Sequence, residues 1–353
     1  MGLIREAIGQ LKDYVPGKTP SDPKAIKLAS NENPFGPSPK AIDALKQAAG
    51  RSQVYPDQQA LSLRNKLAES FGLTADSIVV GNGSDEIMLM ITTAFLSAGE
   101  EAIICRNSFS LYEFVTRLLD GRPVFVPLNN NRQDLPAIAA AITGRTKLIF
   151  LTNPHNPTGS YLSTTELAAF LSKVPPEVLV VIDEAYAEFS TAPDFPKSVE
   201  LLKRFANVIV LRTFSKYYGL AGLRVGYGLA RPELTAPLFK TKLPFNVNRP
   251  AQAAAEAALG DKRFLEKTLK NNEAGKKQLY AAFALLGVEY IKTEANFVFV
   301  NIKKPATDFC RELLARGVSV RPLTSFGFPE AVRVSIGTKG QNDRFIALLK
   351  ALL

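Results

Sequence analysis

The sequence predicts an α/β fold: a large domain built on a mainly parallel, doubly wound sheet of seven strands, followed by a smaller α+β domain. Three observations support this prediction. From residue 77 to residue 229 short apolar runs alternate with segments of helical period, and after Pro244 a long helical region and a few short strands replace this alternation. A chain of 353 residues is also too long for one simple core, so two domains of unequal size are expected.

The first 76 residues are rich in turn formers. Residues 4–11 are amphipathic, and a Pro-rich link leads to a dense run of Asn, Pro and Gly at residues 31–39. A helix should begin there, with Ser38 as its cap and Pro39 in its first turn. A second exposed turn at residues 54–57 precedes a helical pattern at residues 60–71.

Seven apolar runs predict the strands of the large sheet: residues 77–80, 102–105, 123–126, 147–152, 178–182, 208–211 and 225–229. Most of the intervals between them carry a helix-period segment, such as residues 85–96 and 164–174. In the second domain a helical region at 249–286 precedes strands near 297–300 and 331–335 and helices at 306–316 and 341–353. We therefore expect an N-terminal arm at 1–26, a large domain at 27–248 and a small domain at 249–353.

Composition excludes several classes of protein. No apolar run approaches the length of a bilayer span, and Arg5 and Glu6 stand where a signal peptide would need an apolar core. With only two cysteines, Cys105 and Cys310, there is no disulfide framework and no zinc cluster. These features predict a cytoplasmic protein.

The single histidine limits the chemistry. His155 alone cannot build a multi-histidine metal site, so no metal centre is expected and a lysine with an organic cofactor becomes the leading candidate. The 43 basic and 33 acidic residues give a net charge of +10, which suits anionic ligands. Because the basic residues are scattered without a basic tail or an aromatic-basic module, nucleic-acid binding is disfavoured.

Ligands of open parallel sheets bind beyond the carboxyl ends of the strands, so the residues that follow each predicted strand are the candidate ligand-binding residues. Lys216 follows the run at 208–211, where partial desolvation would lower the pKa of its amine and make it a better nucleophile towards carbonyls. Ser215 and Arg224 flank it in a short glycine-rich loop and offer a hydroxyl and a guanidinium fork to a phosphate. A lone lysine of this kind is more often a solvated loop residue. The residues that follow the other strands therefore determine which interpretation holds.

The first two strands are followed by candidate ligands of a phosphate and a ring. Gly81 and Gly83 precede Ser84 and Asp85 at the start of a helix, whose free N–H groups can bind an anion; a plain capped turn would look the same. After the next strand stands Phe109, an aromatic that could stack on a flat cofactor, although core packing is the commoner role.

Two later strands end in polar groups. Asn156 lies between two prolines in a rigid turn, which favours a fixed amide donor over a solvated turn residue; His155 beside it is interpreted as structural. Asp183 ends a wholly apolar strand, where a carboxylate is costly unless a cation pairs with it, and a protonated pyridine nitrogen is such a cation; the alternative is a helix cap. Tyr186 follows it.

Together these loops offer a Schiff-base lysine, an acid for a ring nitrogen, an amide and a phenol for a ring oxygen, a stacking aromatic and a phosphate cup. That inventory matches pyridoxal 5′-phosphate.

The same motifs resemble those of the histidinol-phosphate aminotransferases, within the aspartate-aminotransferase-like superfamily of pyridoxal-phosphate enzymes. The resemblance covers nearly the whole chain and rests on these segments: YVPG at 14–17, NPFGPSP at 33–39, YPD at 55–57, GNGSDE at 81–86, NPHNPTG at 153–159, DEAY at 183–186 and TFSK at 213–216 with GLRVG at 222–226. It implies the fold of pyridoxal-phosphate-dependent transferases.

The resemblance also implies a role for each matching residue. Lys216 would bind the cofactor covalently and shuttle a proton, and Asp183 would keep the ring nitrogen protonated. The remaining cofactor ligands would be Asn156 and Tyr186 at the ring oxygen, Phe109 on the ring, and Ser84, Asp85, Ser215 and Arg224 at the phosphate, with Tyr55 entering from the other subunit of a homodimer. Arg333 would bind the carboxylate of glutamate, and Tyr14 and Arg321 would help to bind the phosphate of the other substrate.

The implied reaction converts L-histidinol phosphate and 2-oxoglutarate to imidazole-acetol phosphate and L-glutamate in histidine biosynthesis. Two departures from the family are His155, where Asn is frequent, and Phe109, where some members carry Tyr; loss of that hydroxyl leaves substrate preference more open. The alternatives are an aromatic amino-acid aminotransferase, a threonine-phosphate decarboxylase and, from another class, a cofactor-binding regulator or scaffold without activity. No DNA-binding module precedes the predicted fold, which disfavours the last.

Overall fold

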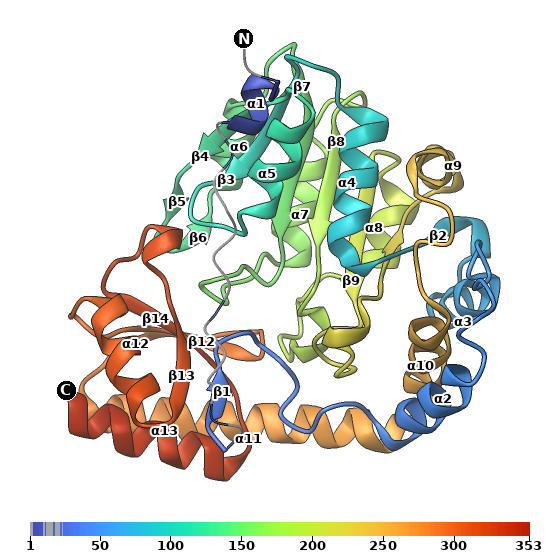
Figure 1. Cartoon of the computed structure of the whole chain (residues 1–353). Helices are drawn as coiled ribbons and strands as arrows, with labels where there is room; N and C mark the ends of the chain where they lie inside the picture. The colour runs from blue at the N-terminus through green and yellow to red at the C-terminus, as the bar shows by residue number, and fades with distance from the viewer. Residues whose placement is uncertain (1–2, 10, 12–16, 18–21, 23) are drawn as a thin grey trace.

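The computed structural model describes residues 3–9, 11, 17, 22 and 24–353 of the chain. Figure 1 shows a large sheet in the upper part of the molecule, a second sheet at the lower left and the long helix α11 (Lys262–Leu286) running along the base beneath both. The α/β fold with a seven-stranded, mostly parallel sheet is confirmed.

The large sheet has the order β2-β10-β9-β8-β7-β3-β4. Its strands are β2 (Ile78–Gly81), β3 (Glu101–Cys105), β4 (Arg122–Val126), β7 (Thr146–Thr152), β8 (Leu179–Asp183), β9 (Val208–Thr213) and β10 (Gly226–Leu229). Neighbours pair in parallel except at β10, which runs antiparallel to both β2 and β9. All seven apolar runs that the sequence indicated form these strands, with ends that differ by one or two residues.

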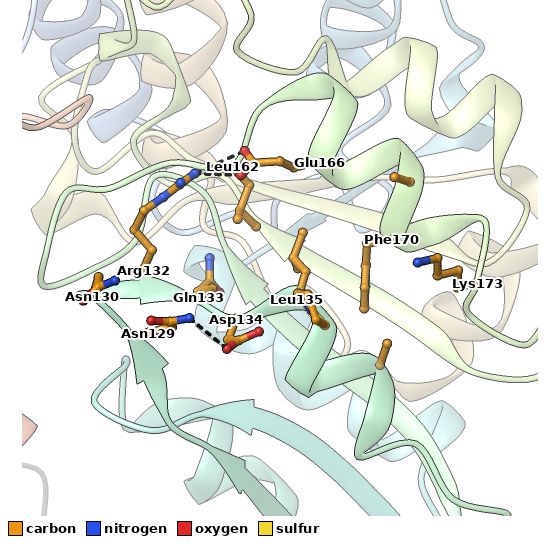
Figure 2. Close-up of a pocket in the computed structure, with 13 residues that line it drawn as sticks. Asn129, Asn130, Arg132, Gln133, Asp134, Leu135, Leu162, Glu166, Phe170 and Lys173 are labelled. Carbon is orange, nitrogen blue, oxygen red and sulfur yellow. Dashed lines mark hydrogen bonds and ion pairs between the residues drawn. The ribbon is translucent and has the colours of Figure 1, made fainter.

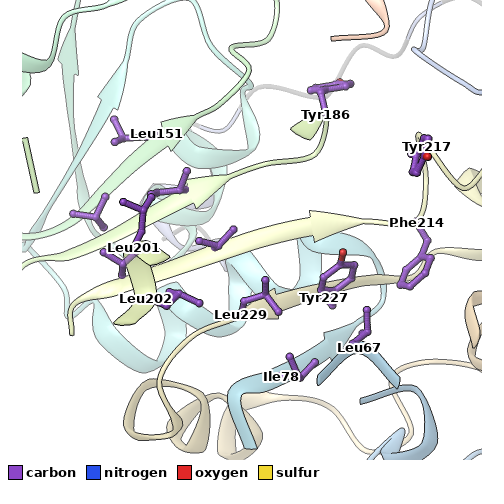
Figure 3. Packing of buried hydrophobic residues seen from close by; sticks show 14 of the residues in the cluster. Leu67, Ile78, Leu151, Tyr186, Leu201, Leu202, Phe214, Tyr217, Tyr227 and Leu229 are labelled. Carbon is purple, nitrogen blue, oxygen red and sulfur yellow. The ribbon is translucent and has the colours of Figure 1, made fainter. Parts of the chain in front are cut away.

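Both faces of this sheet are buried, which explains why its strands are apolar throughout. In β8 the side chains of Val180 and Ile182 join one core, and those of Leu179 and Val181 join the core on the other face. Figure 3 shows part of the first core, with Leu151 of β7 and Leu229 of β10 among its members. Helices α4 (Gly83–Phe95), α5 (Leu111–Leu118) and α9 (Pro232–Thr241) cover one face, and α3 (Leu61–Phe71), α6 (Leu135–Ala140), α7 (Thr164–Leu171), α8 (Ser198–Arg204) and α10 (Arg249–Leu259) cover the other.

The second sheet has five strands in the order β1-β13-β14-β12-β11. They are β1 (Ile26–Leu28), β11 (Glu289–Ile291), β12 (Phe297–Asn301), β13 (Val318–Pro322) and β14 (Ala331–Ser335). A separate core joins this sheet to α11, α12 (Ala306–Ala315) and α13 (Lys339–Leu352). The predicted strands near 297–300 and 331–335 and the helices that follow them are confirmed.

Three strands of the second sheet were missed from the sequence: β1, β11 and β13. β1 pairs in parallel with β13, so Ile26 lies beside Val318 although nearly the whole chain separates them. Such a short strand has no local signal, because its hydrogen-bond partners come from the far end of the chain. The expected boundary between an arm at 1–26 and a large domain beginning at residue 27 therefore runs through a strand of the second sheet.

Local capping explains two helix boundaries. Ser38 caps α2 (Pro39–Ala49) by accepting a hydrogen bond of 3.2 Å from the N–H of Ala41, as predicted. The helical region expected at 249–286 is two helices, because Gly260 ends α10 and the Asp261 side chain caps α11. Among the residues that the structure describes, no helix is both long and apolar enough to cross a membrane.

Candidate active site

Eleven of the thirteen predicted site residues line one cavity at the carboxyl ends of the central strands. This cavity, called the cleft below, has a volume of about 250 Å³ and takes its walls from the large sheet, the second sheet and residues 29–32. The predicted residues in it are Ser84, Asp85, Phe109, Asn156, Asp183, Tyr186, Ser215, Lys216, Arg224, Arg321 and Arg333. The convergence follows from topology, since parallel strands bring their carboxyl ends to one edge of a sheet.

Lys216 is held in the loop after β9 by buried neighbours. Phe214 and Tyr217 pack into the core, and Figure 3 shows both just beyond the strand. The Nζ of Lys216 donates a hydrogen bond of 3.0 Å to the carbonyl oxygen of Ser30. Burial, together with the positive charge of Arg333, lowers the pKa of Lys216 to about 8. The amine therefore loses its proton far more readily than an exposed lysine and is a better nucleophile.

Asp183 stands at the end of β8 as a buried carboxylate with two protein donors. Its Oδ2 accepts a hydrogen bond of 2.7 Å from the Tyr112 hydroxyl, and its Oδ1 accepts one of 3.1 Å from the N–H of Ala185. Tyr112 is also 2.9 Å from the hydroxyl of Thr152. Burial raises the pKa of Asp183 to about 6, and the bond from Tyr112 opposes that rise. The carboxylate lacks a cation among these donors, so a protonated ring nitrogen would complete it.

Asn156 and Arg333 meet across the cleft from opposite sheets. The Oδ1 of Asn156 accepts a hydrogen bond of 2.5 Å from Nη1 of Arg333, which leaves the amide nitrogen as the end that can donate to another group. The Nη2 of Arg333 donates to the carbonyl oxygen of Ala29 at 3.0 Å. Because Val332 and Val334 face the core of the second sheet, Arg333 between them must point to the other side.

The start of α4 forms a close contact with the β9–β10 loop. Arg224 lies in the left-handed region at φ 53° and its Nη2 pairs with Oδ2 of Asp85 at 2.9 Å. A Cβ on Gly83 would lie 2.6 Å from that guanidinium, and a Cβ on Gly226 would lie 2.4 Å from the backbone nitrogen of Ser84. These glycines let the loop approach the helix N-terminus, where free N–H groups and an arginine favour an anion.

Three further aromatic and basic groups complete the walls. The hydroxyl of Tyr186 accepts a hydrogen bond of 2.9 Å from Nδ2 of Asn31. Phe109 contacts Tyr112 edge-on, with ring centroids 5.8 Å apart. Arg321, on β13, is buried and lies over the ring of Phe326 at 5.9 Å. The cleft thus combines the loops of the large sheet with two arginines from the second sheet.

Two predicted residues are not brought to the cleft. Tyr55 is 75% exposed and stacks on Phe245 with ring centroids 4.5 Å apart, on a surface that does not line the cavity. Tyr14 lies outside the residues that the structure describes.

The sequence missed the contribution of residues 29–33, called the strap below. It reaches three predicted site residues: Ala29 accepts from Arg333, Ser30 accepts from Lys216, and Asn31 donates to Tyr186. The only available signal was a cluster of asparagines among turn formers, which indicates unusual backbone but names no partner. Tyr112 was not among the predicted site residues, because its hydroxyl meets Asp183 through tertiary packing that the sequence does not reveal.

A second cavity, of about 450 Å³, lies beside α6 and α7 and holds none of the predicted residues. Figure 2 shows Arg132 paired with Glu166 at its rim, with Leu135 and Phe170 on its wall. Although it is larger, its two carboxylates, those of Asp134 and Glu166, are partly exposed, whereas Asp183 of the cleft is buried, so the cleft is the better candidate for chemistry.

Comparisons with known proteins give the family of the chain. The model of a family described as aminotransferase class I and II matches residues 23–349. The chain is 47% identical to the histidinol-phosphate aminotransferase of Moorella thermoacetica, with 99% of this chain and 92% of that protein covered. It is 44% identical to the corresponding protein of Symbiobacterium thermophilum, with coverage of 100% and 99%. A solved structure of histidinol-phosphate aminotransferase from Sinorhizobium meliloti, in complex with pyridoxal-5′-phosphate, superposes with a TM-score of 0.90 at 29% identity, covering 100% of this chain and 98% of that one.

Proposed function

The chain belongs to the class I and II aminotransferase family, and on that premise we propose that it transfers an amino group from L-histidinol phosphate to 2-oxoglutarate. The products are imidazole-acetol phosphate and L-glutamate, and the reaction belongs to histidine biosynthesis. The observation that carries the proposal is the convergence of Lys216, Asp183 and Asn156 in one cleft with two buried arginines, Arg321 and Arg333. Two such cations suit a pair of substrates that carry a carboxylate and a phosphate.

Pyridoxal 5′-phosphate is the cofactor, and the cleft fits it. Among the described residues, the donors to the buried carboxylate of Asp183 are neutral, the Tyr112 hydroxyl and the N–H of Ala185, which suits a protonated ring nitrogen. The glycine-lined contact between Arg224 and the start of α4 suits a phosphate. When bound, the cofactor supplies an electron sink for the carbanion that forms at the substrate carbon.

We assign the following tasks to the residues of the cleft. Lys216 would hold the cofactor through its Nζ and would move a proton to and from the substrate carbon. Asp183 keeps the ring nitrogen protonated, and Asn156 and Tyr186 donate to the ring oxygen. The hydroxyl of Ser215, the guanidinium of Arg224 and the N–H groups of Ser84 and Asp85 hold the phosphate, while Phe109 stacks on the ring.

Substrate binding is assigned to the arginines of the second sheet. Arg333 is already oriented by Asn156 and Ala29, so it presents its fork to the carboxylate of glutamate without reordering. Arg321 and Tyr14 bind the phosphate of the other substrate in this proposal.

We further propose a homodimer in which Tyr55 completes the cleft of the other subunit. Tyr55 is 75% exposed and stacks on Phe245, and the nearby Leu243 is 70% exposed, so an apolar surface is available to a second copy. A cytoplasmic location is part of the same proposal, since a chain with only two cysteines offers no disulfide framework of the kind that secreted proteins use.

A single-turnover experiment tests the function. The cofactor-loaded protein is mixed with histidinol phosphate, and separately with phenylalanine or tyrosine, while the visible absorbance of the bound cofactor is followed. We expect rapid conversion to the amino form by histidinol phosphate and slow conversion by the aromatic amino acids. Faster conversion by the aromatic amino acids would indicate an aromatic aminotransferase, and carbon dioxide release from threonine phosphate would indicate a decarboxylase.

A further inference from the structure

Asn31, in the strap, connects the second sheet to the loop that follows β8. Its backbone N–H donates a hydrogen bond of 2.8 Å to Oγ of Ser335 on β14, and its carbonyl oxygen accepts one of 2.9 Å from Nδ2 of Asn296. Its side chain bonds to Ser335 at one end and to Tyr186 at the other. The residue is 1% exposed and adopts φ 55°, a conformation that asparagine tolerates better than most residues.

The hydrogen bonds through Asn31 have one consistent direction. Ser335 Oγ lies 3.1 Å from Oδ1 of Asn31 and already accepts the backbone N–H of the same residue, so its own proton goes to Oδ1. The amide is thereby oriented with Nδ2 towards Tyr186, to whose hydroxyl oxygen it donates at 2.9 Å. With that lone pair occupied by a donor, the Tyr186 hydroxyl does not donate back to Asn31.

From this geometry we propose that Asn31 is a positioning residue that makes Tyr186 a hydrogen-bond donor towards the ring oxygen of the cofactor. The inference rests on the proposed function, because it assumes that the ring oxygen lies within reach of Tyr186. It adds that the strap and Ser335, which belongs to the second sheet, set the direction of a bond made by a residue of the large sheet.

The charged and titratable groups around Tyr186 come from several elements. Lys216, in the loop after β9, places its Nζ 6.0 Å from the centroid of the Tyr186 ring. Arg333 of β14 lies 5.3 Å from the ring centroid of Phe297, which packs edge-on against Tyr186. Asp183, at the end of β8, is hydrogen-bonded to Tyr112 of α5. All of these groups are kept in the variants below, so a spectral change in those variants reports on residue 31.

The test reverses the direction of the bond. Asn31→Asp has nearly the same shape and tolerates the positive φ, but a carboxylate can only accept, so it would draw the Tyr186 proton away from the cofactor. A ring oxygen without its donor holds a proton more tightly. The pH midpoint of the visible absorbance of the cofactor-loaded protein should therefore rise by about one pH unit.

The control for direct charge effects is the same substitution in a Tyr186→Phe background. A carboxylate at residue 31 could raise the midpoint by its charge alone, whereas an effect that passes through the hydroxyl must vanish when the hydroxyl is absent. We expect the shift to be lost in the double variant. An equal shift in both backgrounds would overturn the proposal.

Two more variants guard against loss of folding and displacement of the strap. Asn31→Gly keeps the backbone conformation, removes the amide and should raise the midpoint by less than Asn31→Asp. If the midpoint stays at the wild-type value in both variants, the proposal is overturned. Asn296→Ala removes a bond to the backbone of residue 31 but none to its side chain, and should leave the midpoint unchanged. A shift there as large as that of Asn31→Asp would mean that strap placement alone matters, and would also overturn it.

Borohydride reduction followed by peptide mass analysis distinguishes failure of the proposed function from failure of the proposal for Asn31. Cofactor mass fixed on the Lys216 peptide of the wild type and of each variant supports the proposed function, so an unshifted midpoint then counts against Asn31 alone. Absence of that mass from the wild-type peptide would overturn the function and the inference together.

Discussion

The two sheets contribute to the cleft in different ways. The large sheet supplies residues at or just after strand ends, including Asn156, Asp183 and Lys216, whereas the second sheet supplies side chains from within strands, Arg321 on β13 and Arg333 on β14. Residues at strand ends can be recognised from the sequence because each stands out after an apolar run. An arginine within a strand looks like any solvent-facing residue of an alternating pattern until the sheet is placed.

This difference also separates the chemistry from substrate binding in the proposed mechanism. The groups assigned to covalent binding and proton transfer belong to the large sheet, and those assigned to substrate anions belong to the second sheet. The strap touches both sets, through Lys216 and Tyr186 on one side and Arg333 on the other. Substitutions in the two regions should therefore change different observables.

The largest effect is expected for Lys216→Ala, which removes both the covalent anchor and the proton carrier. Turnover should fall by at least about 10⁴-fold and the visible absorbance of the bound cofactor should disappear. Steady-state assays and absorption spectra measure the two effects. Lys203→Ala, at an exposed lysine of α8, is the control and should change neither. Normal turnover by Lys216→Ala would show that Lys216 is neither the covalent anchor nor the proton carrier.

Asp183, at the end of β8, and Glu184, directly after it, should have different roles, the first in the proposed chemistry and the second in stability. Glu184, next to Asp183, is fully buried and its Oε2 accepts hydrogen bonds of 3.0 and 2.7 Å from Arg212. Glu184→Ala leaves that guanidinium with less of its buried counter-charge and should lower the free energy of unfolding by about 3 kcal/mol. Denaturant unfolding measures this loss.

The control for Glu184 is Glu200→Ala, which breaks only the exposed ion pair with Lys203 and should cost less than about 1 kcal/mol. Equal losses from the two variants would show that the buried pair has no special structural role. Activity per folded molecule should stay within the normal range for both, because neither side chain lines the cleft.

In the second sheet, Arg333→Lys tests substrate binding separately from chemistry. A lysine cannot keep the fork that bonds Asn156 and Ala29 while binding a carboxylate. KM for 2-oxoglutarate and for glutamate should rise by about 10- to 100-fold, with the cofactor absorbance retained. Loss of that absorbance would mean that Arg333 supports the cofactor instead. The second sheet would then contribute to cofactor binding as well as to substrate binding.

The sequence predicted the large sheet better than it predicted the second sheet. The seven strands of the large sheet and the capped start of α2 were predicted, since each depends on local apolar runs or a cap. β1 was missed because it has only three residues and its partner strand, β13, lies near the other end of the chain. Arg321 and Arg333 were named through a family resemblance, and nothing in their own strands distinguished them.

Hydrogen bonds between distant residues were also beyond the sequence. The bond from Tyr112 to Asp183 and the bond from Asn31 to Tyr186 join residues on different elements, and only their side-chain placement reveals them. Short motifs predict which chemical groups are present. The partners that orient those groups depend on the whole fold.

The smallest effect is expected at His155, the only histidine of the chain, beside Asn156 in the loop of the large sheet. Its ring is fully buried, Nδ1 lies 2.9 Å from Oγ1 of Thr158, and Nε2 has no hydrogen-bond partner within the part of the chain that the structure describes. Burial lowers its pKa from 6.5 to about 3. Because the unfolded chain binds a proton that the folded state refuses, stability is lost as the pH falls below about 6.5.

His155→Asn should remove this loss, which is on the order of 2 kcal/mol between pH 7 and pH 5 for the cofactor-free protein. Asp183 acts in the opposite sense: its pKa is raised to about 6, so its contribution to stability is present at low pH and is lost as the pH rises through that value. Without His155 the protein should therefore become more stable on mild acidification. Denaturant unfolding of the wild type and of His155→Asn at pH 7 and pH 5 measures the contributions of His155 and Asp183 to the free energy of unfolding. An unchanged loss of stability on acidification in His155→Asn would mean that a group other than His155 binds the extra proton in the unfolded chain.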